Sequence, residues 1–225
     1  MDITWLGHAA FLLEHDGTRV VVDPFLTGNP KGARPAGEVE ADVILLTHGH
    51  ADHFGDTVDI ARRTGATVVA ITELADELGA EEGLDVRDPN LGGTVDLGFA
   101  SVRLVPAWHT ATSPKGTPHT PAGLVVEMGG KRIYHLGDTA LFSDLSLVPR
   151  RGHLDVALMC IGGHYTMDRF DAVVAAEWVK ADRIIPCHYD TFPPIETDVA
   201  EFKAQVESRS DSRVAVLEPG GTHSL

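Results

Sequence analysis

The chain has 225 residues, of which 43% are hydrophobic and 23% are charged. This composition is typical of a globular protein and excludes a disordered one, and the length suits one sizeable core, so we expect a single domain over residues 1–225. The formal net charge of −15, from 18 basic and 33 acidic residues, disfavours a nucleic acid partner. Such a partner needs many basic side chains to displace counterions from its phosphates.

The sequence carries no signal that directs it to a membrane or out of the cell. Glu14, His15 and Asp16 end the first apolar run, so no signal peptide is indicated. No window approaches the roughly 20 apolar residues that a membrane helix needs. Cys160 and Cys187 are the two cysteines, and their apolar surroundings are typical of buried free thiols. We therefore expect a cytoplasmic protein with no membrane partner.

Short apolar runs rich in valine and isoleucine alternate with turns along the chain. The runs predict strands over Asp2–Trp5, Ala10–Glu14, Arg19–Val22, Val43–Thr47, Thr67–Ile71, Ser101–Pro106, Gly123–Met128, Arg132–Leu136, Val156–Ile161, Arg183–Cys187 and Arg213–Leu217. Helical spacing predicts helices over Asp56–Thr64, Glu73–Leu78, Asp168–Lys180 and Val199–Ser208. In the third helix the expected buried stripe is Phe170, Val173, Val174 and Trp178. Proline and glycine predict loops over Gly28–Gly37 and Thr110–Pro121. Hairpins followed by strand–helix alternation, repeated twice, favour a mixed α/β sandwich with helices outside.

The densest chemical signal is the stretch His48-Gly49-His50-Ala51-Asp52-His53, which follows the apolar run Val43–Thr47. Residues two apart in an extended backbone point to the same side, so both imidazoles of His48 and His50 can reach one cation. Asp52 and His53 open the next helix and point to a neighbouring position. Helix capping by Asp52 would explain one residue and leave three histidines unexplained.

Three further candidate ligands, His109, Asp138 and His188, each come just after an apolar run. Sites in sheet-based folds assemble where strands end, so we expect these side chains to join the first cluster. Imidazole and carboxylate ligands suit two divalent metal ions, with zinc favoured and manganese or iron as alternatives.

The order of these motifs resembles the metallo-β-lactamase superfamily over essentially the whole chain. The matching elements are His48-X-His50-X-Asp52-His53, a later single histidine, Gly137-Asp138-Thr139 and a final histidine. Within the superfamily, the segments Trp5–Ala9, Val22–Phe25 and Cys187–Pro193 resemble the branch of metal-dependent hydrolases related to ascorbate-6-phosphate lactonase.

The resemblance implies a four-layer αββα sandwich with the site between two sheet edges. It further implies one metal held by His48, His50 and His109, a second held by Asp52, His53 and His188, and Asp138 bridging both. The antibiotic-degrading members have a cysteine where this chain has Asp138, which argues against β-lactam hydrolysis. The tRNA-processing endonucleases share the ligands, but we find no long arm for gripping tRNA, and the net charge opposes that partner.

The expected function is hydrolysis of a small ester, lactone or phosphoester by hydroxide held between the cations, with Asp52 orienting that hydroxide and moving its proton. The expected partner is a small-molecule substrate. Three alternatives remain open, namely an RNA phosphodiesterase of the same superfamily, a non-catalytic metal-binding regulator and a sulfur dioxygenase with one iron. The resemblance also implies a homo-oligomer, since superfamily relatives of this size often assemble, although no stripe in this sequence points to an interface.

Other polar residues near these motifs have more than one interpretation. His8, in a glycine–histidine turn, is a candidate for contacting substrate or orienting a ligand, and His164, after two glycines, is a candidate substrate contact. Asp23 and Asp190 are candidates for orienting the metal-binding histidines. His119 is placed at the rim of the site and His135 inside a strand as a structural residue. The predicted surface histidines are His15, His153 and His223.

Overall fold

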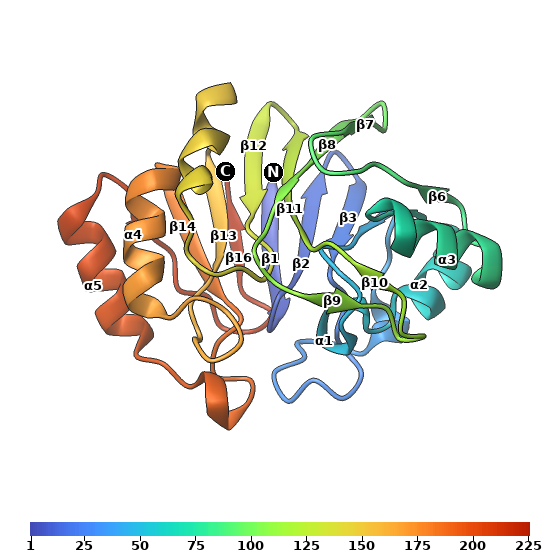
Figure 1. The fold of residues 1–225 in the computed structure, drawn as a ribbon, viewed down its shortest axis with the longest axis horizontal. Coiled ribbons are helices and arrows are strands. Elements are labelled where there is room, and N and C mark those ends of the chain that lie inside the picture. Colours follow the sequence, from blue (N-terminus) through green and yellow to red (C-terminus); the bar gives the residue numbers. More distant parts are fainter.

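A computed structural model describes residues 1–225 and shows two seven-stranded sheets packed against each other, with helices on both outer sides (Figure 1). The first sheet contains, in spatial order, β16 (Thr222–Ser224), β1 (Asp2–Gly7), β2 (Ala10–His15), β3 (Thr18–Val22), β4 (Val43–Leu45), β5 (Thr67–Val69) and β6 (Val86–Arg87). The second contains β15 (Arg213–Val214), β14 (Arg183–Cys187), β13 (Val156–Cys160), β12 (Lys131–His135), β11 (Ala122–Met128), β8 (Ala100–Pro106) and β7 (Thr94–Asp96). A separate small hairpin pairs β9 (Ala111–Thr112) with β10 (Pro118–His119).

The helices form two groups on opposite sides of the sheets (Figure 1). One group consists of α1 (Ala51–Phe54), α2 (Thr57–Thr64) and α3 (Thr72–Glu82), and the other of α4 (Arg169–Val179) and α5 (Val199–Arg209). Three short 3₁₀ helices cover Ala36–Glu38, Ser143–Arg151 and Pro193–Ile195. This arrangement confirms the predicted four-layer αββα sandwich. None of the helices combines the length and the apolar character that crossing a membrane requires.

The parallel strands of each sheet bring their carboxyl ends to one edge. In the first sheet β3, β4 and β5 run parallel, and in the second β12, β13 and β14 do. Between and around the sheets lies one hydrophobic cluster of 61 buried residues to which both sheets contribute. The rigid core therefore fixes the loops that leave these strand ends, which is where polar side chains can be brought together.

The predicted strands are all present, and the errors of prediction lie at edges and ends. The missed strands β6, β7, β9, β10 and β16 are two or three residues long, too short to carry a periodic signal. Two of them, β9 and β10, lie inside the predicted loop Thr110–Pro121. The helix α3 continues past the predicted end at Leu78 and stops at Gly83, which adopts a φ of 67°.

The predicted buried stripe of α4 is wrong at Phe170, whose side chain is 56% exposed. The helix instead buries small side chains, namely Ala172, Val173, Ala175, Ala176 and Val179. Phe170 lies in the first turn, where its ring packs under the guanidinium of Arg169 at 4.1 Å from the ring centroid. Helical spacing alone does not show which face of α4 is buried, because the buried face and the face that carries Phe170 both contain apolar residues.

The buried Tyr134 of β12 allows a test of the core. Its side chain is fully buried, and its hydroxyl has no hydrogen-bond partner. An unpaired buried hydroxyl costs free energy, so Tyr134→Phe is expected to raise the free energy of unfolding by about 1 kcal/mol. Urea denaturation of the metal-free protein measures this change. Tyr165→Phe, at a side chain that is 53% exposed, is the control and leaves the midpoint unchanged. A lower free energy of unfolding for Tyr134→Phe would mean that the hydroxyl is paired.

Candidate metal centre

All seven predicted ligands meet where the strand ends of the two sheets face each other. The first sheet supplies His48, His50, Asp52 and His53, which follow β4 and continue into α1. The second supplies His109 after β8, Asp138 after β12 and His188 after β14. Their ligand atoms, with those of His8, fall into three groups, and the atoms of each group lie within 4.8 Å of one another. One group, His48, His53 and Asp138, shares a histidine with each of the other two.

The first group joins His48, His50 and His109. The Nε2 atom of His48 lies 3.0 Å from Nδ1 of His50. On the other side of its ring, Nδ1 of His48 lies 3.0 Å from the hydroxyl oxygen of Thr47. Because that hydroxyl donates its proton to Asp23, it accepts from Nδ1 of His48, and the lone pair of Nε2 is left to face the group.

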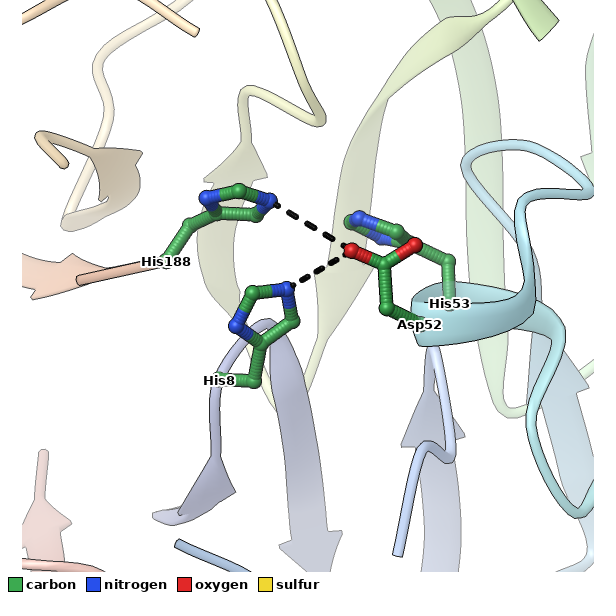
Figure 2. Close-up of side chains that lie close together, drawn as sticks. All are labelled: His8, Asp52, His53 and His188. Atoms are coloured by element: carbon green, nitrogen blue, oxygen red, sulfur yellow. Dashed lines mark hydrogen bonds and ion pairs between the residues drawn. The ribbon is translucent and has the colours of Figure 1, made fainter. Parts of the chain in front are cut away.

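The second group joins Asp52, His53 and His188 with a fourth residue, His8 (Figure 2). His8 comes from the turn between β1 and β2, and its Nε2 lies 3.2 Å from Oδ2 of Asp52. Its Nδ1 lies 2.9 Å from the hydroxyl of Thr191. The Nε2 atom of His188 is 3.9 Å from the same Asp52 oxygen. His8 therefore holds the carboxylate of Asp52 beside the other members of the group.

Asp138 lies between the two groups. Its Oδ2 atom is 3.1 Å from Nε2 of His188, 3.3 Å from Nε2 of His53 and 3.7 Å from Nε2 of His109. The first two histidines belong to the second group and the third to the first. One buried carboxylate oxygen thus faces both groups, which is the geometry that a bridging ligand requires.

A buried aspartate orients the histidine cluster from behind. The carboxylate of Asp23 accepts hydrogen bonds from the backbone N–H of Thr47 at 2.8 Å, the hydroxyl of Thr47 at 2.6 Å and Nδ1 of His53 at 2.7 Å. The hydrogen bond from Nδ1 fixes the tautomer of His53 and directs its Nε2 toward Asp138. This finding supports the predicted orienting role of Asp23.

The residues present fit bound divalent cations. The Nε2 atoms of His53 and His188 are buried and lie at ion-pair distance from Asp138, yet neither makes a hydrogen bond, and Nδ1 of His188 has no hydrogen-bond partner either. Unpaired buried polar atoms are costly, and these atoms belong to a cluster of imidazoles and carboxylates. Cations coordinated by Nε2 of His53 and of His188 would satisfy these two atoms, since neutral imidazole and ionised carboxylate are metal ligands.

The electrostatic environment favours the metal-binding forms of most ligands. Burial lowers the pKa of His48 and of His109, which keeps both imidazoles neutral. Burial alone would raise the pKa of Asp138, but His188 and His53 outweigh it and hold that pKa well below its ordinary value. Burial likewise opposes a charge on His53, yet Asp138 and Asp23 raise its pKa.

Three residues of the site leave their strands with a left-handed backbone. His8, Asp23 and His188 have φ values of 56°, 45° and 54°. Such conformations are uncommon for residues other than glycine and cost roughly 1–3 kcal/mol each. The surrounding structure holds them, for example through the hydrogen bond from the backbone N–H of His188 to the carbonyl of His8 at 2.9 Å. The strain therefore accompanies the residues that shape the second group.

The other candidate residues lie around the cluster. His164 is exposed, belongs to none of the three groups and packs against Tyr165, so the structure does not bring it to the predicted substrate site. His119 of β10 accepts a hydrogen bond at Nε2 from the backbone N–H of Gly49 at 2.9 Å, and so supports the turn between His48 and His50. Asp190 is half-buried and forms an ion pair with Lys31 at 3.8 Å.

The remaining histidines lie away from the cluster. His135 is buried, with Nε2 donating to the carbonyl of Ala9 at 3.1 Å. His153 is exposed, whereas His15 and His223 are half-buried, the latter within β16.

For His8, the sequence predicts either a substrate contact or an orienting role. Its ring is fully buried, and burial lowers its pKa to about 4. The hydrogen bond to Asp52 shows an orienting contact. The available signal was the Gly7–His8 turn, but its proximity to α1 depends on packing that no local pattern encodes.

Comparison with known proteins identifies the family. A family model described as a β-lactamase superfamily domain matches residues 2–188. A UPF0173 metal-dependent hydrolase from Methanopyrus kandleri is 44% identical over 228 residues, covering 99% of each chain, and one from Thermus thermophilus is 46% identical over 221 residues, covering 98% of this chain and 97% of the relative. The solved structure of Igni18, a metallo hydrolase from Ignicoccus hospitalis, superposes with a TM-score of 0.90 at 36% identity, covering 100% of this chain and 98% of the other. The chain therefore belongs to the metallo-β-lactamase superfamily and, within it, to the UPF0173 family of metal-dependent hydrolases.

Proposed function

We propose that the protein is a dinuclear hydrolase that cleaves a small ester, lactone or phosphoester, with zinc favoured and manganese or iron as alternatives. The observation that carries this proposal is the position of the ligands at a cavity of about 570 Å³. The cavity is lined by His50, Asp52, His109 and Asp138 together with Phe25, Ala51, Thr110, Tyr165 and Phe192. Its volume is in the range of small-molecule sites, about 300–1,000 Å³, which supports a small substrate over a nucleic acid.

The residues divide the chemistry between them. His48, His50 and His109 would hold one cation, Asp52, His53 and His188 the other, and Asp138 both. When bound, two divalent cations lower the pKa of a shared water toward about 7 and polarise the substrate oxygen. Asp52 lines the cavity, and only its Oδ2 atom is engaged by His8. Its Oδ1 atom is therefore available to accept the proton of the attacking water.

The open cavity also weighs against a purely structural or regulatory metal site. Structural zinc sites are normally closed by four protein ligands, whereas catalytic sites leave a position open. Here ligands of both groups line a cavity that substrate can enter. The buried Asp23 and Thr47 behind the ligands keep them in place without blocking that opening.

Chelation and reconstitution test this function. Protein stripped with EDTA is expected to lose hydrolysis of simple esters, thioesters, lactones and bis(p-nitrophenyl) phosphate, and to regain at least one of these activities with zinc, manganese or iron. Hydrolysis that persists in the stripped protein contradicts the proposal. Two bound metals without turnover of any substrate would favour the regulator, and one metal with oxygen consumption would favour the dioxygenase.

A further inference from the structure

The wall of the cavity beside the second ligand group is aromatic. Phe25, in the loop after β3, and Phe192, in the loop after β14, lie with ring centroids 6.5 Å apart. Both rings meet the buried His8 edge to face, at 5.9 Å for Phe25 and 5.6 Å for Phe192. Loops from different sheets thus place two partly exposed rings side by side, next to the imidazole that holds Asp52.

The cavity also lacks lysine and arginine side chains. None of the nine lining residues is a lysine or an arginine. The amine of Lys31 is already engaged by Asp190 at 3.8 Å and by the ring of Tyr189 at 5.5 Å. Phosphate and carboxylate substituents are recognised by arginine, lysine or long helix N-termini. The cavity therefore offers an anionic substituent no lysine or arginine partner.

From these two observations we infer that the substrate is an uncharged ester or lactone with an aromatic substituent that packs against Phe25 and Phe192. This inference rests on the proposed hydrolase function and narrows its substrate class. Aromatic rings prefer offset or edge-to-face contacts at centroid distances of about 4.5–7 Å, which the two phenylalanines already adopt with their neighbours. An anionic substituent, such as the phosphate implied by a resemblance to ascorbate-6-phosphate lactonase, does not match this wall.

Hydrolysis rates of matched esters test the inferred preference for an uncharged, aromatic substrate. With the metal-loaded protein, ethyl phenylacetate or benzyl acetate is expected to be hydrolysed with a kcat/KM about tenfold or more above that of ethyl acetate. Monoethyl succinate, which carries a carboxylate, is expected to fall below ethyl acetate. Equal kcat/KM values for the neutral esters, or a preference for monoethyl succinate, would overturn the inference while leaving hydrolysis itself established.

A binding measurement tests the preference for an aromatic group independently of hydrolysis. Calorimetry on the zinc-loaded protein is expected to show that phenylacetohydroxamic acid binds about tenfold or more tightly than acetohydroxamic acid. If this ratio holds and no ester is hydrolysed, the inferred aromatic site stands and the proposed hydrolase function fails. If the ratio is near one, the aromatic site is refuted whatever the turnover.

Substitutions in the wall locate the effect. We expect Phe192→Ala to reduce the ratio of kcat/KM for the aromatic ester to kcat/KM for ethyl acetate toward one, while metal content stays the same. We expect the same of Phe192→Leu, which keeps apolar volume. Phe99→Ala is the matched control, because this exposed phenylalanine in the turn between β7 and β8 does not line the cavity. A ratio that survives both Phe192 substitutions contradicts the role given to this side chain.

Discussion

Replacement of Asp138 by alanine is expected to abolish hydrolysis, with kcat/KM reduced by roughly 10³-fold or more, since loss of cation stabilisation costs several kcal/mol and each 1.4 kcal/mol is about tenfold. The reason is the central position of this carboxylate, whose Oδ2 lies within 3.7 Å of His53, His109 and His188. Without the Asp138 carboxylate, both ligand groups lose the negative charge that faces them. We therefore expect metal content to fall together with activity.

The measurement is metal content by mass spectrometry, together with kinetics on the best ester of the panel. Asp144→Ala, at an exposed aspartate in the Ser143–Arg151 segment, is the matched control and should keep both metals and full activity. Circular dichroism establishes that each variant is folded. An Asp138→Ala protein that retains both metals and its turnover would remove the bridging role from this residue.

Replacement of Asp23 by alanine is expected to have the largest effect on stability. Asp23 is fully buried and accepts hydrogen bonds from the backbone and hydroxyl of Thr47 and from His53. Removing one partner of a buried, paired charge costs about 3–5 kcal/mol, and removing an orienting carboxylate lowers metal affinity by about 10–100-fold. Both effects are expected here, because the same carboxylate serves both purposes.

Urea denaturation of the metal-free protein isolates the effect on folding, and competition with a chelator measures metal affinity. Asp42→Ala is the control, since this exposed carboxylate also accepts a backbone hydrogen bond, from Arg19, and pairs with its guanidinium at 3.8 Å. An exposed pair of this kind contributes about 1 kcal/mol or less. A change of the same size for Asp23→Ala would contradict the account of Asp23 as a buried anchor.

The convergence of the candidate ligands could be predicted from the sequence because their positions follow from local rules. His48 and His50 are two residues apart after a strand, and Asp138 and His188 follow apolar runs that form β12 and β14. Parallel strands bring such residues to one edge whatever the details of packing. The sandwich was predictable for the same reason, because its long strands carry unmistakable apolar runs.

The features that were not predicted depend on contacts between distant segments. The contact of His8 with Asp52 joins the turn between β1 and β2 to α1, 44 residues away. The pairing of Phe25 with Phe192 joins loops of different sheets. His164 shows the converse, since it follows a strand and two glycines as a site residue would, yet its side chain is exposed and does not line the cavity.

The most direct test of the account is anomalous diffraction from crystals of the zinc-loaded protein. We predict two peaks per chain, about 3.5–4 Å apart as in other two-metal sites, with Asp138 between them. One peak should touch His48, His50 and His109, and the other Asp52, His53 and His188. A single peak, or peaks coordinated by other side chains, would contradict the dinuclear centre.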